Sequence, residues 1–193
     1  MSAVNDIQIG GEHYKGSEES LARSISLGFA AFPNHWDYAT QMGCDYLQGA
    51  ASKYLDRYSK KGHALEDLEK SRHYLVKLLD VLDGTEKLDE IDAEQQDMNA
   101  KCCGMERGLS YIEFVYIHEY DGPQAVIGWF VYNFRNEPDP LHALRTAVNL
   151  LDQLISVAKA SPEGAAEASP AATGRQATRA QRAQSVGVRR QTR

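Results

Sequence analysis

Residues 49–82 read GAASKYLDRYSKKGHALEDLEKSRHYLVKLLDVL, and this stretch decides both the fold class and the functional hypothesis. On each side of Gly62, apolar residues recur at spacings of three and four, which is typical of a helix with one buried face. Glycine often ends a helix because it tolerates the left-handed backbone conformation. The stretch therefore predicts two α-helices joined by a turn at Gly62.

The same pattern continues on both sides of this stretch. Trp36 to Met42 predicts a short helix that ends at Gly43, and another short helix is possible within residues 20–32. Leu141 to Ile155 predicts a final amphipathic helix. We therefore expect an all-α protein built as a small helical bundle.

For residues 111–134 the sequence supports either helices or strands. Their aromatic and β-branched composition favours a β-hairpin. Asp121, followed by Gly122 and Pro123, is instead typical of a helix start. We favour helices here. So many aromatic residues are hard to bury in one small protomer, and we therefore also expect a homo-oligomer.

A weak internal repeat supports the helical interpretation. Tyr54-x-x-Arg57 resembles Tyr132-x-x-Arg135, and in each case a polar turn and a leucine-rich helix follow. The similarity indicates either a degenerate duplication or chance likeness between amphipathic helices. If the two Tyr-x-x-Arg motifs are aligned, Val131 corresponds to Lys53.

Composition divides the chain into parts. We expect an irregular arm at 1–34, a helical nucleotide-binding region at 35–92, a second helical region at 93–160, and a disordered basic tail at 161–193. Within the tail, residues 171–193 hold six arginines and no acid, although the whole chain has a net charge of −6. Such a tail is suited to an acidic partner or nucleic acid.

Several classes of protein are excluded or disfavoured. No apolar run is long enough to span a membrane and the N-terminus lacks signal-peptide features, so we expect a cytoplasmic protein. The cysteines form no CxxC pair, and we interpret them as reduced thiols. The chain has no P-loop, no GxGxxG, no HExxH and no GxSxG motif.

Cations around Gly62 are the main functional signal. Lys53, Arg57, Lys60 and Lys61 follow helical spacing, so they are expected to form one positive column that complements a nucleotide's phosphates. Tyr54 offers a ring face to a base beside Lys53. The alternative is an ordinary solvated helix face.

Acidic residues follow the turn. Glu66 and Asp67 either complement the N-terminus of the next helix or hold Mg²⁺, which prefers one or two carboxylates with phosphate oxygens. His73 is either a surface histidine or a phosphate donor and acid–base group.

These residues carry a resemblance. Four segments, which begin at Ile7, Trp36, Gly49 and Asp67, resemble the SaV-like phage nucleotide kinase family over residues 7 to about 83. The matched positions are His13, Tyr14, Trp36, Asp37, Lys53, Tyr54, Arg57, Lys61, Asp67, Lys70, His73 and Tyr74.

The resemblance implies a bacteriophage-encoded, mostly helical protein in the host cytoplasm that phosphorylates deoxynucleoside monophosphates, with ATP and Mg²⁺ as expected cofactors. In this hypothesis Lys53, Arg57 and His73 are catalytic, and Asp67 and Glu66 hold the metal. The substrate-binding residues are His13, Tyr14, Trp36, Tyr54, Lys61, Lys70 and Tyr74.

Two alternatives stay open. One is a non-enzymatic phage protein that binds a nucleotide signal, a host protein or nucleic acid. The other is an Mg²⁺-dependent nucleotide pyrophosphohydrolase, for which the acids near Glu86-x-x-Asp89 give only weak support.

Overall fold

The structure is a computed structural model that describes residues 16–60, 62–83 and 92–161. Within these ranges the regular elements are helical, as the sequence predicts. They are α1 (Glu18–Ser26), α2 (His35–Gln41), α3 (Tyr46–Arg57), α4 (Ala64–Leu82), α5 (Ala93–Cys102), α6 (Tyr111–His118), α7 (Gly122–Asn133), the short 3-10 helix η3 (Phe134–Asn136) and α8 (Pro140–Ala160).

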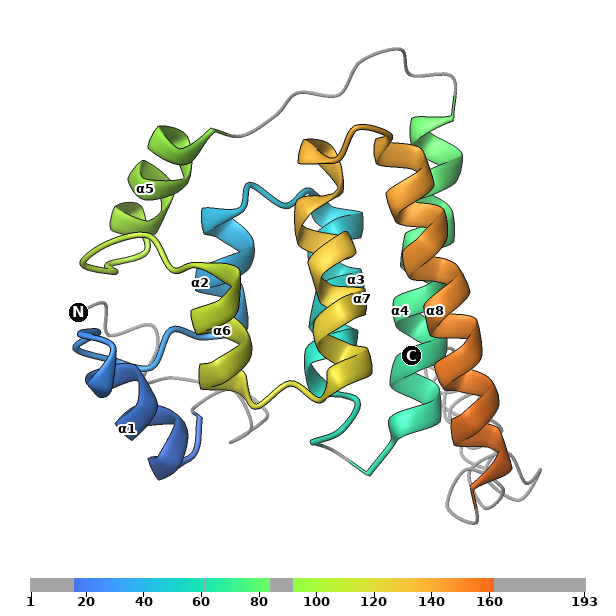
Figure 1. Cartoon of the computed structure of the whole chain (residues 1–193), viewed down its shortest axis with the longest axis horizontal. Coiled ribbons are helices and arrows are strands. Elements are labelled where there is room, and N and C mark those ends of the chain that lie inside the picture. Colours follow the sequence, from blue (N-terminus) through green and yellow to red (C-terminus); the bar gives the residue numbers. More distant parts are fainter. Residues whose placement is uncertain (1–15, 61, 84–91, 162–193) are drawn as a thin grey trace, which may run out of the picture.

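The helices form successive pairs across the molecule (Figure 1). The pairs α4 with α8 and α3 with α7 make a four-helix core, in which α3 also packs on α4, and α7 on α8. α2 and α6 lie next to this core, and α2 contacts α3. At the outer end α1 packs on α6, and α5 packs on α2.

Two apolar clusters hold these helices together. The larger one joins α3, α4, α7 and α8 around leucines such as Leu55, Leu68 and Leu151, all fully buried. In the second cluster Tyr38 of α2 stacks on Phe114 of α6, with ring centres 4.2 Å apart. Both clusters draw residues from the two halves of the chain, so the halves share their core.

The aromatic stretch at 111–134 is helical, and the hairpin alternative is wrong. Ser110 and Glu113 form a reciprocal capping box at the start of α6. Asp121 caps α7, which has a proline in its first turn. Burial explains only part of the strand-like composition. Phe114, Ile117, Ile127 and Val131 are buried, whereas other large apolar residues of the two helices, Ile112, Tyr116, Val126 and Trp129, are exposed.

The N-terminal region differs from the expected irregular arm. Residues 18–26 form α1, which is capped by Ser17 and packs on α6, in agreement with the short helix that the sequence allowed. The second helical region begins with α5, at Ala93. Residues 1–15, residue 61, residues 84–91 and the basic tail from 162 onward lie outside the described residues. In the described ranges, no helix combines the length and apolarity needed to cross a membrane.

Candidate functional site

A groove of about 310 Å³ lies where α2, α3 and α4 meet. Its lining combines small residues, four aromatic residues and one lysine. The lining residues are Trp36, Ala39, Thr40, Cys44, Asp45, Tyr46, Gly49, Ala50, Lys53, Tyr54 and Tyr74.

One face of α3 explains most of this lining. Tyr46, Gly49, Ala50, Lys53 and Tyr54 follow each other at helical spacing, so they point to the same side. Small side chains at 49 and 50 leave space one turn before Lys53. The helix is fixed at its start by Asp45, whose carboxylate accepts a hydrogen bond from the backbone N–H of Gln48 at 2.8 Å.

Lys53 is the cation inside the groove. Its Nζ lies 5.3 Å from the centre of the Trp36 ring and 5.8 Å from that of Tyr54, in the range of cation–π contacts. The side chain is half-buried. Within the described part of the chain, Lys53 forms no ion pair with a carboxylate. Among the described residues, its charge is therefore compensated only by aromatic rings.

Tyr54 is the centre of a wider cationic cluster. Arg57 Cζ lies 4.8 Å and Lys70 Nζ 5.5 Å from the centre of its ring. Tyr74 stacks on Tyr54, with ring centres 5.7 Å apart and planes inclined by 8°. The structure thus brings together six predicted site residues: Trp36, Lys53, Tyr54, Arg57, Lys70 and Tyr74.

Arg57 has a different role from the predicted one. Its Nε and Nη2 donate to the two carboxylate oxygens of Asp67 at 2.9 and 2.7 Å, and Asp67 is fully buried. This fork-like pair joins α3 to α4. Arg57 is therefore already neutralised by Asp67.

The predicted magnesium ligands do not form a metal site in this arrangement. Asp67 is held by Arg57, and Glu66 pairs with Lys70 on the exposed face of α4. In the described ranges, no group of three or more histidine, cysteine, aspartate or glutamate side chains is placed to hold a metal ion. The described residues do not fit a magnesium ion held by the protein alone.

The expected column of cations does not form. Lys53 and Arg57 lie beside Tyr54, but Lys60 follows the end of α3 and pairs with Asp56 at 2.9 Å, away from the groove. His73 is exposed on α4 and meets Tyr74 edge-on without lining the groove. His13, Tyr14 and Lys61 lie outside the described residues.

Sequence analysis missed several lining residues, above all Tyr46 and Cys44. Tyr46 is 77% exposed and lies edge-on to Tyr74, with ring centres 6.3 Å apart. Its helical spacing to Gly49 and Lys53 was a signal that could have identified it. Cys44 precedes the helix, so no periodic pattern marks it; burial raises the pKa of its thiol well above the usual range.

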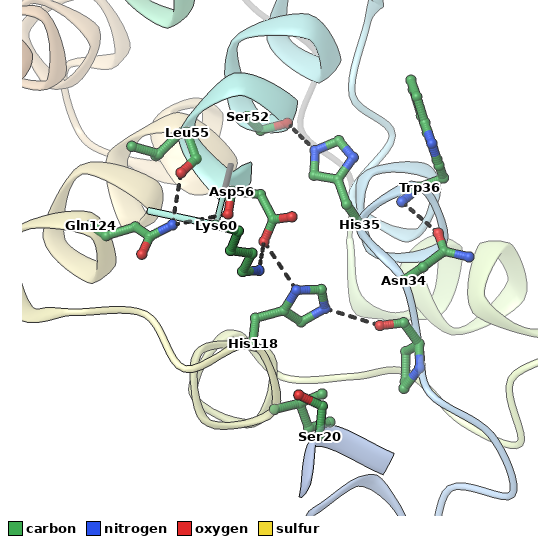
Figure 2. Close-up of polar contacts among 12 residues, drawn as sticks. Ser20, Asn34, His35, Trp36, Ser52, Leu55, Asp56, Lys60, His118 and Gln124 are labelled. Atoms are coloured by element: carbon green, nitrogen blue, oxygen red, sulfur yellow. Dashed lines mark hydrogen bonds and ion pairs between the residues drawn. The ribbon is translucent and has the colours of Figure 1, made fainter. Parts of the chain in front are cut away.

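Behind the groove, α2 and α3 are joined by a buried polar contact (Figure 2). His35 Nε2 lies 2.8 Å from Ser52 Oγ, while the Ser52 hydroxyl donates to the carbonyl of Gly49. Because that proton is used, His35 Nε2 must be the donor to Ser52, and Nδ1 is the unprotonated nitrogen. Burial lowers the pKa of His35 to about 4, so the ring is neutral near pH 7.

Asp56 connects this region to α6 (Figure 2). Its carboxylate lies 3.0 Å from His118 Nδ1 and 2.9 Å from Lys60 Nζ, and His118 Nε2 donates to the Pro33 carbonyl. Burial alone would raise the pKa of Asp56. The charges and hydrogen bonds of His118 and Lys60 outweigh burial and hold that pKa well below its usual range.

Comparisons with known proteins add no relative. No protein-family model, no curated protein and no solved structure matches this chain.

Proposed function

We propose that the groove binds a nucleotide, with its phosphate at Lys53 and its base against the aromatic rings. The observation that carries this proposal is the half-buried Lys53, held between Trp36 and Tyr54 without a carboxylate partner among the described residues. Withdrawing an ammonium group from water costs free energy unless an anion compensates it. A phosphate group supplies that anion.

The groove also suits the other half of a nucleotide. Trp36, Tyr54 and Tyr74 present ring faces and edges at its walls, and bases stack on such rings with little dependence on sequence. A volume of about 310 Å³ is at the lower end for small-molecule pockets. A single mononucleotide fits this scale better than a nucleic-acid strand.

The family resemblance extends the proposal to phosphoryl transfer from ATP to a deoxynucleoside monophosphate. Such chemistry needs mainly positioning and charge stabilisation, and Lys53 can neutralise a phosphoryl group. A different observation favours binding without turnover as the second candidate. The expected magnesium ligands Asp67 and Glu66 are already paired with Arg57 and Lys70.

Calorimetric titration of nucleoside mono-, di- and triphosphates, with and without Mg²⁺, tests the binding proposal. We expect at least one mononucleotide to bind, and Lys53→Ala to weaken that binding by about tenfold to a hundredfold, the worth of one charge-assisted contact. Lys77→Ala, on the exposed side of α4, is the matched control and should leave the affinity unchanged. If no nucleotide binds at millimolar concentration, the proposal is wrong.

Product analysis separates the possible activities. Formation of a nucleoside diphosphate from ATP and a monophosphate identifies a kinase, and release of pyrophosphate without an acceptor identifies a pyrophosphohydrolase. Tight binding with neither product identifies a non-enzymatic nucleotide receptor.

Further partners remain part of the proposal. The homo-oligomer expectation now concerns only the large apolar residues that stay exposed in the aromatic stretch: Ile112, Tyr116, Val126 and Trp129. Light scattering at micromolar concentration tests it, and a monomer would contradict it.

The arginine-rich tail is proposed to bind nucleic acid or an acidic partner in the cytoplasm of a phage-infected host. Such binding should weaken as the salt concentration rises, and deletion of residues 171–193 should remove it.

A further inference from the structure

Three pairs of corresponding helices in the two halves begin a constant distance apart in sequence. The starts of α2 and α6, of α3 and α7, and of α4 and α8 all differ by 76 positions. The residues that cap them therefore also pair at this shift: Asn34 with Ser110, Asp45 with Asp121, and His63 with Asp139. Even the capping-box acids Asp37 and Glu113 are 76 apart.

Helix ends follow the same shift. Gly28 and Gly104 close α1 and α5 with φ of 89° and 82°. Gly43 and Glu119 close α2 and α6 with φ of 59° and 55°. Glu119 is the one non-glycine residue with positive φ in the described ranges, and it occupies the position where the first half has glycine.

Contacts between the halves are reciprocal. Gln48 Nε2 donates to the Val131 carbonyl at 2.8 Å, and Gln124 Nε2 donates to the Leu55 carbonyl at 2.7 Å. The donor Gln124 lies 76 positions after the donor Gln48, and the acceptor Leu55 lies 76 positions before the acceptor Val131. Only a two-fold relation between the halves produces such an exchange of partners.

Larger features obey the same relation. Tyr38 and Phe114, again 76 apart, stack on each other, as expected of equivalent residues near a two-fold axis. α1 of the first half packs on α6 of the second, and α5 of the second packs on α2 of the first (Figure 1).

We propose that residues 16–83 and 92–159 are two copies of one unit, in which the second copy acts as the permanent dimer partner of the first and has lost its own ligand groove. The part that concerns the ligand rests on the proposed function. The register differs from that suggested by the Tyr-x-x-Arg motifs, because the counterpart of Lys53 is Trp129 and not Val131.

The counterpart of the groove in the second copy lacks the binding residues. Ile112, Trp129, Phe130 and Leu150 stand where the first copy has Trp36, Lys53, Tyr54 and Tyr74. No cation remains among these four positions. Tyr111 replaces His35, and its hydroxyl donates to the Ala125 carbonyl, at the position that corresponds to Gly49. A Cβ on Gly128, the counterpart of Ser52, would come within 2.4 Å of that hydroxyl. Tyr111 thus fills the space in which His35 and Ser52 meet behind the groove of the first copy.

The second copy nevertheless supports the groove of the first. Arg135 Nη2 donates to Asp45 Oδ2 at 3.1 Å, and Asp45 both lines the groove and caps α3. In the opposite direction, the Tyr58 hydroxyl donates to Asp121, the cap of α7. Each copy thus holds the start of the other copy's central helix.

A tandem chain tests the proposal. In this variant residues 92–159 are replaced by the sequence of residues 16–83, and the rest of the full chain is kept. We expect a folded protein whose two copies give nearly one set of backbone amide signals by NMR. Titration with deoxyadenosine monophosphate, or with whichever mononucleotide the natural chain binds, should give two sites per chain in place of one.

The outcomes separate the two proposals. One set of signals, with nucleotide binding by neither the tandem chain nor the natural chain, supports the duplication and removes the proposed function. One set of signals with a single site per chain contradicts the proposal that the second copy lost its groove because its residues differ from those of the first copy. A folded tandem chain with two distinct sets of signals overturns the two-fold relation.

If the tandem chain fails to fold, distances between pairs of spin labels on the natural chain test the two-fold relation instead. The labels are placed on the natural sequence, after its three cysteines have been replaced. A two-fold relation requires equal distances for the exposed pairs Glu66→Cys with Asn149→Cys and His142→Cys with His73→Cys. Equal distance distributions support the proposal, and clearly different ones overturn it.

Discussion

At the scale of single residues, His35 shows how burial sets a protonation state that the sequence does not reveal. The ring is 1% exposed, and its pKa is lowered to about 4, mainly by burial. An unfolded chain would protonate the same histidine near pH 6.5. Between these two values the unfolded state binds more protons, so the free energy of unfolding falls as pH falls.

His35→Gln should therefore flatten the pH dependence of stability. We expect the natural chain to lose about 2 kcal/mol more than this variant between pH 7 and pH 5, since each pKa unit of difference is worth about 1.4 kcal/mol. Urea unfolding at the two pH values measures the difference. His142→Gln, at an exposed position, serves as control. An unchanged slope in His35→Gln would show that folding does not lower the pKa of His35.

For some site residues the spacing within one helix was enough to predict the role, whereas for others the role depends on how two helices pack. Lys53 and Tyr54 were predictable, because charge and ring share one face of α3. The pairing of Arg57 with Asp67 was not, because it depends on how α4 packs on α3. From the sequence we expected both residues to contact a ligand, whereas in the structure they form an ion pair that joins α3 to α4.

At the scale of elements, capping residues predicted helices better than composition did. Residues 111–134 have the composition of strands, yet Asp121 with Pro123 predicted the start of α7. The capping box of Ser110 and Glu113, which was not part of that prediction, is a second helix-start signal in the same stretch. Propensity failed here because it reflects how side chains pack and not how the backbone is capped: α6 packs into the second apolar cluster and α7 into both.

The end of α6 gives an element-scale prediction. Glu119 adopts φ 55°, which a side chain makes unfavourable and glycine tolerates. Glu119→Gly should raise stability by about 1 kcal/mol and raise Tm by a few degrees. The Arg23 ion pair that it removes has a 61% exposed glutamate and contributes little.

Thermal unfolding of Glu119→Gly beside Glu119→Ala isolates the backbone effect. Alanine removes the same ion pair but keeps the unfavourable φ, so only the glycine variant should gain stability. If both variants change Tm equally, the strain at this position does not limit stability.

At the scale of the molecule, the sequence hid the correct register of the repeat. Only 9 of the 68 aligned positions hold the same residue, and four of these are leucines in α4 and α8. The Tyr-x-x-Arg motifs are more conspicuous, as is the sequence Leu-Leu-Asp, which occurs at 78–80 and again at 150–152. However, these two pairs align at shifts of 78 and 72. What the two copies share is backbone geometry, such as caps and left-handed turns, which different residues can satisfy.

A shared core predicts how the chain responds to cleavage between the copies. Residues 84–91 connect α4 to α5 in sequence, and the larger apolar cluster takes Leu55 and Leu68 from the first copy and Leu144 and Leu151 from the second. Separating the copies would expose these fully buried leucines, at about 1.5 to 3 kcal/mol each. Non-covalent association should therefore survive the loss of the covalent link.

A protease site inserted at 84–91 of the full chain makes this measurable. After cleavage we expect both fragments to elute together at the size of the uncut protein and to unfold in one cooperative transition. The inserted but uncut chain is the control for the insertion itself. Because cleavage makes association bimolecular, the Tm of the cut protein should rise with its concentration, whereas that of the uncut chain should not. Two fragments that elute separately, or two independent transitions, would mean that each half is stable without the other.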